Sequence, residues 1–147
     1  MKITNFKIYP VRIPFSFPIN HHLKNRASSS SVVLAVNTDD GRTGYGEGAP
    51  REYVTGESLL EVTNALETAL IYCTNRVIDT LQDIENLCLE LYQKYQLPSM
   101  VSAIEIALLD LLGQAKNCSI AQFLIPQNVF ETNAEQDNFV LLPVGIH

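Results

Sequence analysis

Only a few side chains in this sequence have the type and spacing needed for chemistry. His21 and His22 are adjacent and could form half of a metal site, but neighbouring residues point in different directions and no third ligand is near. Lys24 and Arg26 could pair with an acidic group of a substrate, or could equally be exposed surface charges. Glu47 stands between two glycines and could act as a general acid. No nucleophile–base pair and no glycine-rich phosphate loop accompany them, which argues against a small independent enzyme.

The composition is that of a globular protein. The chain has 147 residues, of which 46% are hydrophobic and 18% charged, and this length matches one domain or one domain with a short extra segment. A net charge of −6 opposes attraction to phosphate backbones, so we expect no nucleic acid partner. No stretch reaches the roughly 18 apolar residues of a membrane span, and the amino terminus lacks the apolar core of a signal peptide. We therefore expect no membrane association and a cytoplasmic location.

The cysteines do not suggest a disulfide framework or a zinc site. Cys73, Cys88 and Cys118 form no CxxC pair and are odd in number. Reduced, buried thiols are the expected state.

The first half of the chain predicts three antiparallel strands. They are expected at residues 2–13, 32–36 and 42–49. Residues 15–31 carry prolines, asparagines and a serine run without any period, so we expect a mobile surface loop there. The Asp39-Asp40-Gly41 segment predicts a tight turn between the second and third strands. Glycines at alternate positions from 44 to 48 leave one face of the third strand bare, which lets another backbone or helix approach closely.

The second half predicts helices. Apolar residues recur at spacings of three and four from Ser58, from Thr80 and after Pro98. Thr80 can cap the second helix, and Ser99 or Ser102 the third. A short apolar turn over residues 120–125 follows. The predicted fold is therefore of the α+β class: a three-stranded antiparallel meander followed by a three- to four-helix bundle packed on one sheet face.

Three segments, in order, resemble the amino-terminal capping domain of the enolase superfamily, in the branch of mandelate racemase and muconate-lactonizing enzyme. They are DDGRTGYGEGAP (39–50), REYVTGE (51–57) and AIEIALLDLLGQA (103–115). The 53–57 pattern is most similar to the group of muconate cycloisomerase, dipeptide epimerase and o-succinylbenzoate synthase. One departure is FLIPQ at 123–127, where the family usually has a Leu-Leu-Gly-Gly-like turn.

The resemblance implies that chemistry lies outside this chain. Residues 1–125 would form the capping domain, and residues 126–147 a linker with a possible first strand, at 139–142, of a TIM barrel that is otherwise absent. Family members hold Mg²⁺ with carboxylates of the barrel and abstract a proton next to a substrate carboxylate with barrel Lys or His residues. We therefore assign no catalytic or metal residue here, and expect this chain alone to be inactive. The implied partners are the barrel domain and a small carboxylate substrate, and a homo-oligomer is possible.

Such a capping domain contributes specificity through two loops that close over the barrel and exclude water. By resemblance they are residues 15–31 and 50–57. The candidates for contact with a substrate are Ile19, His22, Lys24 and Arg26 in the first loop, and Arg51, Tyr53, Val54 and Thr55 in the second. Tyr53 and Val54 could instead staple the following helix.

Two acidic residues are expected to be structural. By resemblance, Glu47 is a carboxylate bonded to nearby backbone. Asp110, inside an apolar helix where a charge needs partners, is expected to form a hydrogen bond across the sheet–helix junction.

A second hypothesis is a stand-alone, truncated descendant that serves as a non-catalytic binding or assembly module. A solitary capping domain would expose the face that normally packs on the barrel, and should therefore self-associate. Strictly monomeric behaviour at high concentration would count against this expectation.

Overall fold

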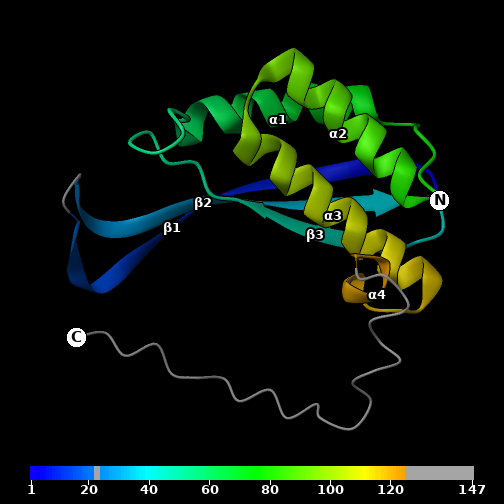
Figure 1. Cartoon of the computed structure of the whole chain (residues 1–147), viewed down its shortest axis with the longest axis horizontal. Helices are drawn as coiled ribbons and strands as arrows, with labels where there is room; N and C mark the ends of the chain where they lie inside the picture. Colours follow the sequence, from blue (N-terminus) through cyan, green and yellow to red (C-terminus); the bar gives the residue numbers. More distant parts are fainter. Residues whose placement is uncertain (22–23, 125–147) are drawn as a thin grey trace, which may run out of the picture.

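A three-stranded antiparallel sheet with helices on one face forms the described part of the chain (Figure 1). The computed structural model describes residues 1–21 and 24–124, with the backbone alone at 18–21, 24–26, 123 and 124. The strands, in sheet order, are β1 (Ile3–His21), β2 (Lys24–Thr38) and β3 (Thr43–Gly48). The helices are α1 (Leu59–Cys73), α2 (Leu81–Tyr95), α3 (Pro98–Lys116) and the short α4 (Ile120–Leu124). The predicted α+β class and element order are confirmed. The predicted linker and strand within 126–147 lie outside the described residues.

The bare face of β3 receives the backbone of α3. The glycines Gly44, Gly46 and Gly48 lie opposite the buried residues Val36, Leu34 and Val32 of β2. A Cβ atom added to Gly46 would overlap the carbonyl oxygen of Ala103 and lie 2.8 Å from the amide nitrogen of Ala107. The close approach predicted from the alternate glycines is confirmed, and α3 runs across this part of the sheet in Figure 1.

Polar contacts fix α3 to the edge of β3. The Oδ2 atom of Asp110 accepts a hydrogen bond from the backbone N–H of Tyr45 at 2.9 Å. Gln114 donates through Nε2 to the carbonyl of Thr43 at 2.9 Å and to Oδ1 of Asp110 at 3.1 Å. The role predicted for Asp110 is confirmed.

The prediction for Glu47 is wrong. Side chains alternate along a strand, so with the glycines facing α3 the Glu47 side chain projects from the opposite face. It is exposed, and it forms no hydrogen bond within the part of the chain that the structure describes.

The predicted mobile loop at 15–31 is also wrong. Strands β1 and β2 continue as a paired hairpin as far as His21 and Lys24, with an irregular register between Pro14 and Ile19. β3 pairs only with residues 32–37 of β2, so the rest of the hairpin is a two-stranded ribbon that extends beyond the helices (Figure 1). Backbone pairing can form such a ribbon where no helix covers it, and it then needs no regular alternation of apolar and polar residues.

The first two helices begin at caps encoded in the local sequence. Ser58 and Glu61 form a capping box at α1, and Thr80 and Asp83 form one at α2. The cap predicted at Thr80 is confirmed: its Oγ1 accepts from the backbone N–H of Asp83 at 3.2 Å.

The third helix begins differently from the prediction. Its N-cap residue is Leu97, Pro98 occupies the first turn, and no side chain of the helix caps it. Neither Ser99 nor Ser102 acts as the cap. Ser99 lies inside the helix and donates hydrogen bonds to Glu57, which is distant in the sequence.

α3 is the central helix of the fold. It has 19 residues and a mean hydropathy of 1.2. Among the described residues it is therefore a helix long and apolar enough to cross a membrane. More than half of it is buried inside the fold, because it packs against β3 and the other helices. A buried core helix meets the same criteria.

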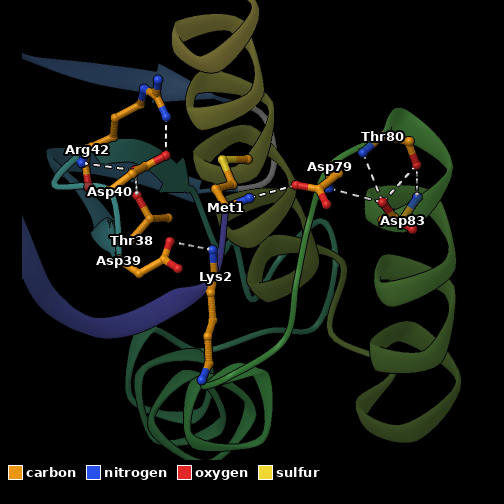
Figure 2. A network of polar contacts seen from close by, with 9 residues as sticks. All are labelled: Met1, Lys2, Thr38, Asp39, Asp40, Arg42, Asp79, Thr80 and Asp83. Atoms are coloured by element: carbon orange, nitrogen blue, oxygen red, sulfur yellow. Dashed lines mark hydrogen bonds and ion pairs between the residues drawn. The ribbon is translucent and has the colours of Figure 1, made fainter.

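The start of β1 is joined to two connecting segments by polar contacts (Figure 2). The Met1 ammonium donates to Oδ1 of Asp79 at 2.6 Å, and the backbone N–H of Lys2 donates to Oδ1 of Asp39 at 2.8 Å. Asp79 also donates its backbone N–H to Oδ2 of Asp83 at 3.0 Å. The sheet, the turn after β2 and the start of α2 are thus connected through one polar network.

The Asp83 carboxylate predicts an acid-dependent stability. Hydrogen bonds from the backbone N–H of Asp79 and from Thr80 lower the pKa of Asp83 below its ordinary value near 3.8. The ionised Asp83 carboxylate therefore adds to the free energy of unfolding above pH 3.8, the ordinary pKa of an aspartate. This stabilisation is lost as the pH falls through the lower pKa of Asp83 in the folded state. We expect Asp83→Ala to lower the Tm at neutral pH, and the difference from the parent to narrow in strong acid. Calorimetry gives the Tm of the parent and of the variant at neutral pH and below about pH 3. A difference in Tm that does not depend on pH would contradict the stabilising role of the Asp83 carboxylate.

The cysteines predict selective labelling. Cys73 and Cys88 are buried and free, as expected, whereas Cys118 is only half-buried. Burial raises the pKa of the Cys73 thiol to about 11 and that of Cys88 to about 12. The thiolate is the reactive form, so a maleimide should label Cys118 alone in the folded chain and all three cysteines in denaturant. Peptide mass spectrometry identifies the labelled residue, and rapid native labelling of Cys73 would show that its site opens.

Candidate functional site

The β1–β2 hairpin and the 50–57 loop meet at a hollow of about 300 Å³. Its walls include Arg12, Ser28 and Ser30 of the hairpin and Arg51, Tyr53 and Glu57 of the loop. The two segments that carry the predicted substrate contacts therefore share one concave surface.

Arg51 joins the loop to the hairpin. Its Nη1 donates to the backbone carbonyls of Ser30 at 2.6 Å and Pro50 at 2.7 Å. Its Nη2 donates to Oγ of Ser29 at 3.2 Å. The guanidinium group of this half-buried residue, which lines the hollow, is thus held in place.

A tight turn follows Arg51. Its carbonyl accepts hydrogen bonds from the backbone N–H groups of Val54 at 2.9 Å and Thr55 at 2.8 Å, and from Oγ1 of Thr55 at 3.2 Å. Gly56 then adopts a φ of +77°, a left-handed backbone conformation that residues other than glycine seldom adopt. These hydrogen bonds close the turn, and the side chain of Val54 is 67% exposed.

Glu57 anchors the other end of the loop to the core. It is only 2% exposed, and its carboxylate accepts from the backbone N–H of Ser99 at 2.8 Å and from Oγ of Ser99 at 2.6 Å. The first N–H groups of a helix have no partner within the helix and carry partial positive charge, so a carboxylate is well placed there. Glu57 therefore serves as a distant cap of α3.

The structure places the candidates of the second loop in two groups. Arg51 and Tyr53 line the hollow. Val54 is exposed and does not line the hollow, and the hydroxyl of Thr55 donates within the turn.

The first-loop candidates are described less fully. Ile19 pairs with Arg26 across the hairpin, and Lys24 pairs with His21, which fixes their backbone positions only. His22 lies outside the described residues.

Three features of the hollow were missed by the sequence analysis. Arg12 and the serines at 28–30 meet because of the hairpin register, which pairs Arg12 with Ser30, and residues 15–31 were predicted to be a loop. Glu57 was seen only as part of a helix start. A carboxylate directly before the cap residue Ser58 is a weak signal, since nothing local shows that it points into the core.

The site offers groups that can bind a polar ligand. Guanidinium and hydroxyl groups line the hollow and can orient a polar ligand. Over residues 1–21 and 24–124 there is no cluster of three His, Cys, Asp or Glu side chains that could hold a metal ion.

Comparison with known proteins gives consistent matches over the described region. The sequence model of the mandelate racemase / muconate lactonizing enzyme N-terminal domain matches residues 3–124. The N-succinyl-L-Arg/Lys racemase of Bacillus cereus is 30% identical over 128 residues, which cover 84% of this chain and 33% of the racemase. Its crystal structure superposes with a TM-score of 0.77 at 28% identity, over 84% of this chain and 33% of that one.

A second solved relative carries ligands. It is the dipeptide epimerase of Enterococcus faecalis in complex with Mg and the dipeptide L-Leu-L-Tyr, with a TM-score of 0.76 and 27% identity. The match covers 84% of this chain and 34% of the epimerase. The chain thus spans about one third of the length of the relatives it matches.

Proposed function

Because the chain belongs to the family of mandelate racemase / muconate lactonizing enzyme N-terminal domains, the capping domains of the enolase superfamily, we propose that it selects the substrate of a Mg²⁺-dependent isomerase or lyase. The reaction would be proton abstraction next to a substrate carboxylate. The observation that carries the proposal is the hollow formed jointly by the hairpin and the 50–57 loop, the two segments assigned to substrate contact.

The relatives support a substrate class. The Bacillus cereus relative is a racemase of N-succinyl-Arg/Lys, and the Enterococcus faecalis relative is an epimerase of dipeptides. Both names describe amino-acid derivatives that bear a carboxylate. We propose the same class of small carboxylate for the enzyme to which this chain contributes.

The metal and the acid–base groups would come from a barrel domain. Mg²⁺, when bound there, stabilises the enediolate that forms on proton abstraction. This chain's own residues would bind and orient the distal part of the substrate and exclude water from the reacting carbon. We propose that the 147-residue chain by itself exchanges no substrate proton.

A chimera tests the proposal. Residues 3–124 would replace the matching third of the Bacillus cereus racemase, and kcat/KM would be measured for N-succinyl amino acids and for dipeptides. We expect the substrate preference to change with the capping segment while the Mg²⁺ requirement is retained, because specificity is a difference in transition-state binding. The control is a second chimera that carries residues 3–124 of this chain except for the 50–57 loop, which is kept from the racemase. A folded, Mg²⁺-binding chimera with the unaltered preference of the racemase would refute the assignment.

The outer face of the sheet favours a second candidate, a non-catalytic assembly module. Tyr9, Ile13 and Tyr45 are 46%, 58% and 57% exposed. Tyr9 and Tyr45 lie opposite Val33 and Ala35, so they share the sheet face turned away from the helices. Sedimentation of the chain distinguishes the two: self-association through this face, lost in Tyr45→Glu, supports an assembly module, and a monomer at high concentration argues against it.

A further inference from the structure

We propose that the hollow between the hairpin and the 50–57 loop binds a carboxylate group of a small molecule through Arg12 and Arg51. The inference rests on the proposed function in one respect, because it takes this molecule to be the substrate. It then implies a substrate with a second carboxylate, distant from the carbon that reacts.

Both guanidinium groups keep unused donors at the hollow. An arginine carries five N–H donors. Arg12 uses its Nε to donate to Oγ of Ser28 at 3.0 Å, and Arg51 uses three donors, to Ser30, Pro50 and Ser29. The remaining N–H groups have no acceptor within the described part of the chain, and a carboxylate can accept from them in the planar, bidentate geometry that guanidinium favours.

Among the residues that the structure describes, no carboxylate forms an ion pair with either of these two arginines. Four arginine side chains are described, and Arg42 and Arg76 each form an ion pair with a neighbouring acidic residue. Arg12 and Arg51 form none with any residue that the structure describes. Of the four arginines whose side chains are described, the two without an ion pair thus line the same hollow.

Two acidic residues, Glu52 and Glu57, also line the hollow. Both carboxylate oxygens of Glu57 accept hydrogen bonds from Ser99 at the start of α3, which compensates its charge. Glu52 is exposed to solvent, where its charge is screened. The hydroxyl group of Ser30, which also lines the hollow, adds a group that can donate to an anion.

The size of the hollow suits part of a small molecule. A volume of about 300 Å³ is at the lower end for ligand pockets, enough for a carboxylate and the short chain that carries it. Arg51 is already held by the hairpin, so its binding to a ligand would cost little further side-chain ordering.

The test uses the full chain with ¹⁵N-labelled arginine, titrated with succinate at constant ionic strength. We expect saturable shifts of the Nε–H signals of Arg12 and Arg51, and none for the ion-paired Arg42 and Arg76. Neutral succinamide, of the same size, should produce no shift. Arg12→Gln should weaken succinate binding at least about tenfold, the loss expected for one charge-assisted hydrogen bond.

Matched variants separate the site from the fold. Arg51→Gln should also weaken binding, but it removes the link to the hairpin, so Arg12→Gln, which leaves that link intact, is the decisive variant. Arg42→Gln, in the turn between β2 and β3, is the control and should bind succinate like the parent. Equal shifts at all arginines, equal shifts with succinamide, or unchanged binding by Arg12→Gln would each overturn the inference.

The outcome is independent of the chimera experiment. Specific succinate binding combined with an unaltered preference of the chimera would retain the site and refute the proposed function. A changed preference without succinate binding would retain the proposed function and refute the site.

Discussion

Replacing Gly46 with alanine should lower the free energy of unfolding by about 3 kcal/mol, a large part of the stability of a typical domain. The added Cβ would overlap the carbonyl oxygen of Ala103 and lie 2.8 Å from the amide nitrogen of Ala107. Both atoms belong to the backbone of α3, so no side chain can rotate away. The helix would have to move off the sheet, and it carries much of the core.

Neighbouring positions provide the controls. Tyr45→Ala and Glu47→Ala change exposed side chains on the other face of the same strand, and each should alter stability by less than about 1 kcal/mol. Gly56→Ala has open space around its Cβ but a φ of +77°, so it should cost only the backbone strain of about 1–2 kcal/mol. Urea denaturation followed by circular dichroism gives all four values. A Gly46→Ala variant as stable as the controls would contradict the close packing of α3 on β3.

Elements with local signals could be predicted from the sequence. In the capping boxes at Ser58 and Thr80, the contacting residues are only three positions apart. The local sequence is therefore enough to indicate the contact. The glycines from 44 to 48 report a steric requirement directly, because a position without a Cβ is most useful where another backbone comes close.

The outer hairpin could not be predicted for a physical reason. Prediction of a strand relies on alternation between a buried and an exposed face. On the amino-terminal side of Val32, β2 pairs with β1 but not with β3, so the serine run lies outside the three-stranded sheet and shows no apolar alternation. The meeting of Arg12 with Ser28 depends on the hairpin register, which the sequence did not reveal.

The contact between Glu57 and Ser99 joins residues 42 positions apart, and removing it should have the second largest effect. Glu57→Ala would leave the buried N–H and hydroxyl of Ser99 without an acceptor. We expect a loss of about 3 kcal/mol, since a hydrogen bond to a charged group contributes about 1.5–3 kcal/mol and an unsatisfied buried donor adds to the cost. Glu57→Gln keeps an acceptor oxygen and should be intermediate. Glu52→Ala, an exposed carboxylate of the same loop, is the matched control and should change stability by less than about 0.5 kcal/mol.

A double-mutant cycle isolates the contact itself. If Glu57 and Ser99 stabilise each other, Ser99→Ala should cost about 1 kcal/mol less in the Glu57→Ala background than in the parent. Hydrogen exchange then tests what the contact does for the loop: the amides of Val54 and Thr55, protected by the turn at Arg51, should exchange faster in Glu57→Ala. Additive losses with unchanged exchange would mean that the loop holds its shape without the core. Coupled losses with faster exchange would mean that the core helix positions the loop, so that a mutation inside α3 could alter substrate selection without touching the substrate.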